Sequence, residues 1–201
     1  MCIRDRPTKR DKSKETAIVK HMKIYTRKGD DGTTGLFYGG RVKKASPRPS
    51  AYGEVDEAQA AIGVARAQIT KGSDLDNLLV QILRDLWVLM AELATLPENR
   101  DKLEPETSLT TSHMVHRLEE AIDEFSEKFE MPNEFIVPGQ NPVAAHFDFA
   151  RTVVRRAERA VLVIEVEDSN VMPYLNRLSD LMWIIARTQE KKSLTAKEKK
   201  E

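Results

Sequence analysis

The pattern of apolar and polar positions predicts a chain built almost entirely of helices. Apolar residues recur every three or four positions in five stretches, which gives each stretch one apolar face as an α-helix. The expected helices cover approximately residues 48–69, 74–95, 109–129, 142–165 and 173–191. Short connectors separate them, so we predict an all-α, ferritin-like up-down bundle of five helices. The second stretch is the most apolar, and we expect it to be central.

The fourth expected helix carries two neighbouring stripes. It starts with Asn141 as N-cap and Pro142 at the first helical position. One stripe consists of Phe147, Ala150, Val154, Ala157 and Val161, and the other of Arg151, Arg155 and Arg159 with Glu158 beside them. Arginine suits bidentate binding of phosphate or carboxylate, which indicates an anion site. Taken alone, a surface helix with Arg–Glu pairs explains this stripe equally well.

The segment before the first helix, residues 23–36, is dense in Gly, Thr and Asp. Such a loop exposes backbone N–H groups and hydroxyls, and Arg27 and Lys28 add positive charge, which suits a polyphosphate. The Gly-Lys-Ser/Thr sequence of a P-loop is missing. Taken alone, a loop of this composition is more often an ordinary turn.

The charge balance and the cysteine content exclude several classes of function. Lys plus Arg equals Asp plus Glu at 32 each, which argues against a nucleic-acid binder that relies on a general basic field. Cys2 is the only cysteine, so we expect no internal disulfide and no cysteine nucleophile. No apolar run approaches the ~18 residues that span a bilayer. We therefore expect a cytoplasmic protein with neither a membrane nor a nucleic acid as partner.

The two ends of the chain are polar and lack periodicity. Residues 1–21 are expected to be a disordered or non-native leader, with Met22 as a plausible true start. A targeting peptide is the rival interpretation, but its acids fit poorly with the acid-poor composition of transit peptides. The predicted helical domain covers residues 22–192, and residues 193–201 form a polar tail that we expect to fray.

The histidines give little support for metal or hydrolytic chemistry. His113 and His116 lie three apart on the third expected helix, without the Glu-x-x-His pairs of a di-iron bundle. His146 has Asp148 nearby, but no serine in a nucleophile elbow accompanies them. We therefore expect no metal ligands from the protein. The polar cluster at 176–180 in the last helix is not explained by capping alone, and we expect this end of the helix to meet the arginine helix and the N-terminal loop.

Four blocks of sequence together resemble one known family, the PduO-type ATP:cob(I)alamin adenosyltransferases. They are KIYTRKGDDGTTGL at 23–36, AYGEVDEAQAAIG at 51–63, FIVPG at 135–139 with ARTVVRRAER at 150–159, and YLNRLSD at 174–180. The blocks follow the family's order and span nearly all of residues 22–190. Each block alone is modest, but the four in order are highly specific.

The resemblance implies an enzyme that moves the 5′-deoxyadenosyl group of ATP to Co(I) of reduced cobalamin. The products are adenosylcobalamin and triphosphate, and magnesium accompanies ATP. The family forms trimers of five-helix bundles with active sites between subunits. The corrinoid carries the difficult chemistry, so the protein needs no nucleophile of its own. A cobalamin reductase and an adenosylcobalamin-dependent enzyme are the partners that this function implies.

The resemblance also assigns roles to individual residues. ATP would be held by Thr26, Arg27, Lys28, Gly29, Thr34, Gly35 and Lys44 of the N-terminal loop. Arg155 and Arg159 would grip the phosphates with Glu158 holding them, and Asn176 would contact the nucleotide. Arg151 would pair with Asp56 of the neighbouring subunit. Phe135 would press on the lower face of the corrin and keep the dimethylbenzimidazole ligand off cobalt.

The chain departs from the family pattern at several points. Residues 138–141 read Pro-Gly-Gln-Asn where Pro-Ser-Gly-Gly or Pro-Gly-Gly is common, and Arg27-Lys28 stand where Lys-Thr is usual. The connector at 165–173 is a few residues short.

Two other functions stay open at this point. One is a carrier of the same fold that delivers adenosylcobalamin with little turnover, although a pure carrier has no need of the full ATP set. The other is a regulatory trimer that binds ATP only, and the apolar segment from Phe135 to Val137 argues against it.

Overall fold

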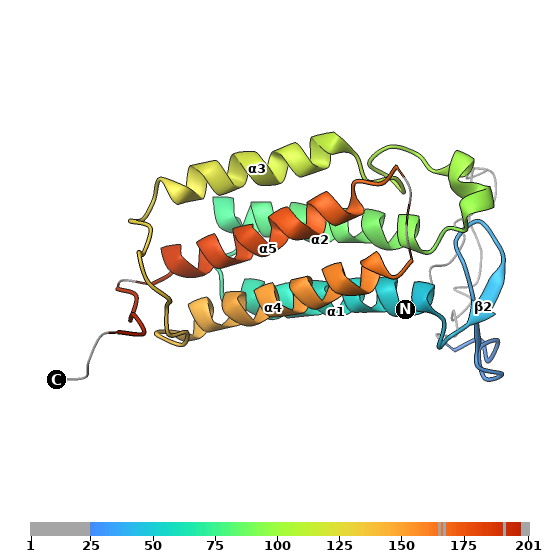
Figure 1. Ribbon diagram of the computed structural model, residues 1–201, viewed down its shortest axis with the longest axis horizontal. Coiled ribbons are helices and arrows are strands. Elements are labelled where there is room, and N and C mark those ends of the chain that lie inside the picture. The colour runs from blue at the N-terminus through green and yellow to red at the C-terminus, as the bar shows by residue number, and fades with distance from the viewer. Residues whose placement is uncertain (1–24, 165, 167, 191, 198–201) are drawn as a thin grey trace, which may run out of the picture.

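A computed structural model of the chain describes residues 25–164, 166, 168–190 and 192–197. The expected leader at 1–21 lies outside these residues. Helices that run alternately in opposite directions along one long axis make up most of the described chain (Figure 1). They are α1 (Pro47–Arg66), α2 (Asp74–Leu93), α3 (Ser112–Ser126), α4 (Pro142–Leu162) and α5 (Val171–Thr188). The predicted five-helix up-down bundle is therefore confirmed.

Three short elements lie in segments that the sequence predicts only as loops. β1 (Thr33–Gly35) pairs antiparallel with β2 (Arg41–Lys43), and a 3₁₀-helix, η1 (Pro97–Lys102), follows α2. The amide N–H of Phe37, in the turn between the strands, donates to the carbonyl of Ala94 at 2.9 Å. This bond attaches the hairpin to the end of α2, at the right of Figure 1.

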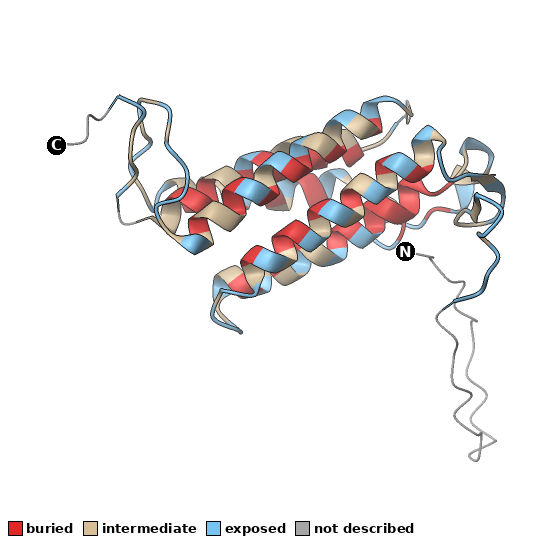
Figure 2. Cartoon of the chain, turned by 90° about the horizontal axis from the view of Figure 1, so that it is seen from below, coloured by how far each residue is buried: buried red, intermediate tan, exposed pale blue. Residues whose placement is uncertain are grey.

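The helices pack in the order α2, α1, α4, α5, α3. α4 packs closely against both α1 and α5, whereas α2, which we expected to be central, packs closely against α1 and reaches α3 and α5 through Asp85. Small side chains explain the close packing of α4 on α1, since Ala58 and Ala65 of α1 and Ala150 and Ala157 of α4 are fully buried and let the two backbones approach closely. Figure 2 shows the buried residues on the inner faces of the helices.

The sequence predicts the helix starts to within a few residues. Asn141 caps α4 as expected, because its Oδ1 accepts from the amide of Ala144 at 2.9 Å. α3 starts three residues later than expected, since Thr111 is its N-cap and accepts from Met114 N at 3.3 Å. Among the residues that the structure describes, no helix combines the length and the apolar composition of a membrane span.

A buried carboxylate, Glu92, fastens the end of the bundle that carries the hairpin. Its oxygens accept from Arg100 Nη2 at 3.1 Å, from Ser169 Oγ at 2.7 Å and from the amide of Thr110 at 2.8 Å. These partners come from η1, from the α4–α5 connector and from the segment before α3. Glu92 thus joins three loops to α2.

A second buried carboxylate, Asp85, joins three helices. It accepts from the hydroxyl of Tyr174 on α5 at 3.0 Å and from Arg117 on α3 at 3.3 Å. Burial, followed by the charge of Asp85, raises the pKa of Tyr174 well above its ordinary value. Asp85 therefore keeps the phenol protonated and fixes α2 against α3 and α5.

The polar tail does not fray as expected over the residues that the structure describes. The amide of Val137 donates to the carbonyl of Leu194 at 2.8 Å, and the amide of Ala196 donates to the carbonyl of Phe135 at 2.8 Å. The tail therefore adds a short antiparallel pairing to the segment before α4. Alternating polarity in five or six residues is too weak a signal to predict such a contact.

Candidate functional site

The loop before β1 is held in shape by its own side chains. Asp31 accepts from the amide of Thr33 at 2.9 Å and from its hydroxyl at 2.7 Å, and these bonds lower the pKa of the carboxyl. Arg41 donates to the Thr33 hydroxyl at 3.1 Å and to the carbonyl of Lys28 at 2.5 Å. The loop is thus closed by Asp31, Thr33 and Arg41, while the side chains of Arg27 and Lys28 stay exposed.

Two features of this loop suit a bound anion. Arg27 has a φ of 59°, a left-handed conformation that is uncommon outside glycine and often marks functional sites. At Gly29, a Cβ would lie 3.0 Å from Lys44 Nζ and 3.2 Å from the Thr33 carbonyl. A side chain at this position would therefore push the ammonium of Lys44 a few tenths of an ångström away from the turn. Thr26 is exposed, whereas Thr34 and Gly35 lie on β1.

The four arginines at the middle of α4 differ in their surroundings. Arg156 Nε donates to Glu54 of α1 at 2.5 Å and its Nη2 contacts Glu57, which raises the pKa of Arg156. Arg155 and Arg159 are exposed, and no hydrogen-bond or ion-pair partner is found for them in the described part of the chain. Arg156 therefore joins α4 to α1, whereas Arg155 and Arg159 are available to a ligand.

Glu158 contacts α5 instead of the arginines that we expected it to hold. Its Oε1 accepts from Asn176 Nδ2 at 3.1 Å, and no bond to Arg155 or Arg159 is found among the described residues. Asn176 Oδ1 in turn accepts from Arg177 at 2.9 Å. The expected meeting of the last helix with the arginine helix is therefore found, through Glu158 and Asn176.

Arg151 lies one turn closer to the start of α4 and is partly buried. Its Nε is 3.9 Å from Oδ1 of Asp148, three residues earlier on the same helix. Asp56, the expected partner in a neighbouring subunit, is half-buried on α1.

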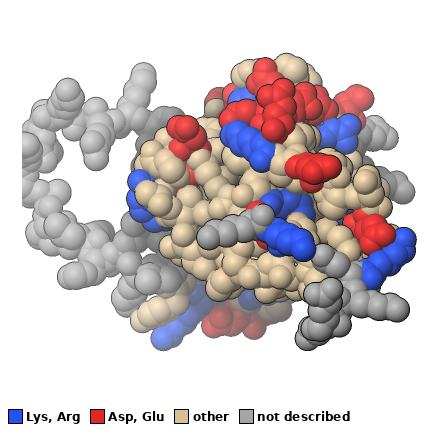
Figure 3. Space-filling model, turned by 90° about the vertical axis from the view of Figure 1, so that its left-hand side faces the viewer, with Lys and Arg blue, Asp and Glu red and all other residues tan. Residues whose placement is uncertain are grey.

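Phe135 is 89% exposed, although it is a large apolar side chain. It lines a pocket of about 380 Å³ together with Pro132, Asn133, Glu134, Ala196 and Lys197. Lys197 also pairs with Glu134 at 3.0 Å, so the tail forms one wall of this pocket. Figure 3 looks at this end of the molecule and shows charged side chains of both signs, with Lys or Arg side chains near the middle of the view.

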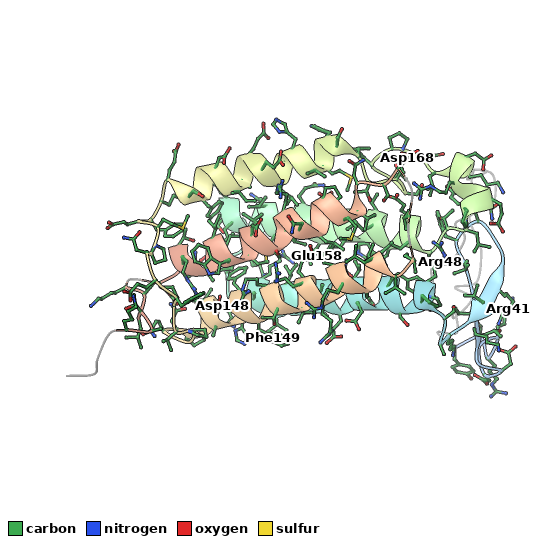
Figure 4. All side chains as sticks on the ribbon, viewed as in Figure 1. Arg41, Arg48, Asp148, Phe149, Glu158 and Asp168 are labelled. Carbon is green, nitrogen blue, oxygen red and sulfur yellow. The ribbon has the colours of Figure 1, made fainter. Side chains whose placement is uncertain are left out.

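The candidate residues are spread along the whole bundle. Figure 4 shows Arg41 of the hairpin at one end, Asp148 at the other and Glu158 between them. The segment that contains Phe135 precedes α4 and lies at the Asp148 end (Figure 1). α4 has 21 residues and is therefore about 30 Å long. Within one chain, the hairpin loop and Phe135 are at opposite ends.

The sequence-based prediction missed Arg41 and Glu92 as organisers of the hairpin end. Arg41 follows a Gly-Gly pair, which marks a turn, but nothing local indicates which carbonyl its side chain reaches. Glu92 sits in an apolar helix, and a buried acid in such a stretch is a usable signal for a polar network. No group of three or more His, Cys, Asp or Glu residues that could hold a metal ion is found among the described residues.

The fold is that of a helical-bundle protein, and its exposed arginines can bind an anionic group. The sequence model of one family, cobalamin adenosyltransferase, matches residues 24–189. The chain belongs to the cobalamin adenosyltransferase family.

The chain is similar to curated relatives and to solved structures over most of its length. It is 42% identical over 174 residues to the corrinoid adenosyltransferase of Mycobacterium tuberculosis, covering 84% of this chain and 89% of the relative. It is 40% identical to corrinoid adenosyltransferase PduO of Salmonella typhimurium, covering 84% of this chain and 50% of that protein.

Among solved structures, a variant PduO-type ATP:corrinoid adenosyltransferase from Lactobacillus reuteri, complexed with cobalamin and ATP, superposes with a TM-score of 0.77. It is 30% identical, and the match covers 88% of this chain and 100% of the other.

Proposed function

We infer that this protein transfers the 5′-deoxyadenosyl group of ATP to Co(I) of a reduced corrinoid. Family membership and a relative solved with both cobalamin and ATP support this function. The electron pair of Co(I) attacks C5′, a cobalt–carbon bond forms and the C5′–O bond breaks. The bonding electrons leave with triphosphate, and cobalt becomes formally Co(III). The observation that carries the proposal is a pair of exposed arginines on α4, Arg155 and Arg159, for which the described residues offer no partner. They lie beside the hydrogen bond that joins Glu158 of α4 to Asn176 of α5.

In this proposal the protein positions ATP and stabilises the charge of the leaving triphosphate. Arg155 and Arg159 bind phosphate oxygens, and magnesium enters with ATP. Asn176 contacts the nucleotide. The N-terminal loop holds ATP through Thr26, Arg27, Lys28, Gly29, Thr34, Gly35 and Lys44. The exposure of Arg27 and Lys28 and the close approach of Lys44 to Gly29 support the loop's role.

We further propose that the active site lies between subunits of a homotrimer. The hairpin loop and Phe135 lie at opposite ends of a bundle about 30 Å long. A cobalt atom must meet C5′ of ATP within bonding distance, so one chain alone would not bring both segments to it. A neighbouring copy would supply the missing segment, with Asp56 pairing with Arg151 across the contact.

Phe135 is proposed to press on the lower face of the corrin. Its 89% exposure supports this role, because a large apolar side chain in water costs free energy unless something covers it. Displacing the lower ligand leaves cobalt four-coordinate, which better accommodates the electron pair of Co(I). An apolar wall also keeps water from a strong nucleophile.

The setting and the partners follow from this chemistry as further proposals. We propose a cytoplasmic protein, since the single cysteine, Cys2, allows no internal disulfide. A cobalamin reductase would have to supply Co(I), and an adenosylcobalamin-dependent enzyme would use the product.

An anaerobic absorbance assay tests the function. Purified protein is mixed with chemically reduced cobalamin and magnesium-ATP, and the Co(I) band is followed while the alkylcobalamin spectrum appears. Equal amounts of photolabile product and triphosphate are expected. If both ligands bind and nothing is transferred, the carrier function replaces the enzyme, and Gln140-Asn141 becomes the first departure to revert.

A further inference from the structure

A buried row of alternating charges lies at the end of the bundle where α4 begins. Arg187 of α5, with a side chain 2% exposed, donates from Nη2 to Asp148 Oδ2 at 2.5 Å and to Glu190 Oε1 at 3.2 Å. The second oxygen of Asp148 is 3.9 Å from Nε of Arg151. The charges therefore alternate from Glu190 through Arg187 and Asp148 to Arg151.

With Arg151 included, this row holds two cations and two carboxylates. Glu190 alone would neutralise Arg187, and both side chains are almost completely buried. Asp148 adds a second carboxylate, and its side chain is only 11% exposed. Burying a carboxylate without a compensating cation is strongly unfavourable, so Asp148 needs a cation of its own. Arg151 is a further cation within 4 Å of it, with Nε 3.9 Å from Oδ1. Asp148 therefore faces Arg187 with one oxygen and Arg151 with the other.

The orientation of Arg151 follows from which of its atoms meets Asp148. Nε is inaccessible to solvent and has no hydrogen-bond partner in the described residues, whereas the side chain as a whole is 33% exposed. The edge that carries Nε thus faces inward. The Nη groups remain for an external carboxylate or phosphate, which a guanidinium binds with two parallel bonds.

We propose that Asp148 is a positioning residue for the transfer reaction. It holds the Nε edge of Arg151, so that the Nη groups are presented to the site between subunits. Arg187, which Glu190 also contacts, holds Asp148 in turn. This inference rests on the role proposed above for Arg151, and it adds a residue that the sequence comparison with the family did not single out.

A structural role for Asp148 makes a different prediction. If Asp148 only neutralises Arg187, its loss destabilises the bundle and lowers activity whether or not Arg151 is present. If it acts through Arg151, its loss has no further effect once Arg151 is gone. The two roles are therefore separated by a double-mutant cycle.

The cycle compares wild type, Asp148→Asn, Arg151→Ala and the double variant in the anaerobic assay. Asp148→Asn is expected to lower kcat about tenfold, because a misplaced guanidinium weakens the transition state, with the KM for ATP changed less than about threefold. In the Arg151→Ala background, Asp148→Asn should leave kcat unchanged. An equal loss of kcat in both backgrounds would overturn the proposal.

The matched control is Asp85→Asn, which removes an equally buried carboxylate that contacts Tyr174 and Arg117 and not Arg151. It should lower the melting temperature and leave kcat unchanged, measured well below that temperature. A tenfold loss of kcat in Asp85→Asn would show that the Asp148 effect is unspecific, and the proposal would fall.

An NMR measurement decides the matter without turnover. Solvent exchange of the Arg151 Nε–H is followed in ¹⁵N-labelled protein, with the signal assigned by its loss in Arg151→Lys. Asp148→Asn should exchange this proton several times faster than wild type, and Asp85→Asn should not. Unchanged exchange in Asp148→Asn overturns the positioning role even if wild-type protein transfers nothing, an outcome that would refute the proposed function separately.

Discussion

Replacing Arg155 by alanine is expected to abolish most ATP use while leaving the fold intact. The side chain is exposed and has no hydrogen-bond or ion-pair partner among the described residues. Its removal should therefore change the free energy of unfolding by less than about 0.5 kcal/mol. If its two Nη groups bind phosphate in the transition state, the loss is about 3 kcal/mol, or about a hundredfold in kcat/KM.

The adjacent Arg156 gives a matched control, because it differs from Arg155 mainly in where it points. It is bonded to Glu54 and Glu57 of α1, so Arg156→Ala should lower the melting temperature by removing a link between α1 and α4. It should affect ATP use far less than Arg155→Ala does. Arg155→Ala is thus expected to lose activity and keep its melting temperature, whereas Arg156→Ala is expected to lower the melting temperature and keep most of its activity.

The two variants are compared by thermal unfolding and by initial rates of adenosylcobalamin formation at saturating Co(I) corrinoid and varied ATP. Near-normal kinetics for Arg155→Ala would refute the assignment of phosphate binding to this residue. A large drop in melting temperature for Arg155→Ala would show instead that the side chain has structural contacts, and the loss of activity would then carry no information about the nucleotide.

Three further predictions concern other parts of the molecule. Phe135→Ala should impair the reaction with cobalamin more than with cobinamide, which lacks the lower ligand, and equal losses in parallel rate measurements would remove the ligand-displacement role. Glu92→Gln should lower the free energy of unfolding in urea by about 3 kcal/mol, because the buried carboxylate accepts from three donors and an amide must turn an N–H toward one of them. The exposed Glu120→Gln is the control, and a similarly small loss of stability in both variants would contradict this. Hydrogen bonds from the amide of Gly72 and then from Arg66 lower the pKa of Asp76. The difference in unfolding free energy between wild type and Asp76→Asn should therefore be complete above the ordinary pKa of 3.8 and vanish as the pH falls through the lowered pKa. Urea titrations across this pH range measure it, and a difference that persists at the lowest pH would disprove the linkage.

The features that the sequence predicted correctly are those that depend on neighbouring residues. The stripe on α4 and its Asn141 cap follow from positions within a few residues of each other, and both were found. The pairing of Val137 with Leu194 and the bond from Phe37 to Ala94 join distant segments through backbone atoms, which carry no sequence signal. These were missed.

The same limit applies to the candidate site. Spacing alone placed Arg151, Arg155 and Arg159 on one stripe and left Arg156 off it. That Arg156 binds Glu54 and Glu57 could be known only once α1 was found beside α4. The exposed state of Phe135 was likewise not predictable from an apolar run, which more often marks a buried strand.

The placement of the hairpin loop and of Phe135 at opposite ends of one bundle has a consequence for genetics. If each site takes its loop from one subunit and its Phe135 from the next, a chain with a defective loop and a chain with a defective Phe135 can complement each other. In randomly mixed trimers, about a quarter of the sites would receive an intact loop and an intact Phe135. Two alleles that are inactive alone would then restore partial activity when they are expressed in the same cell.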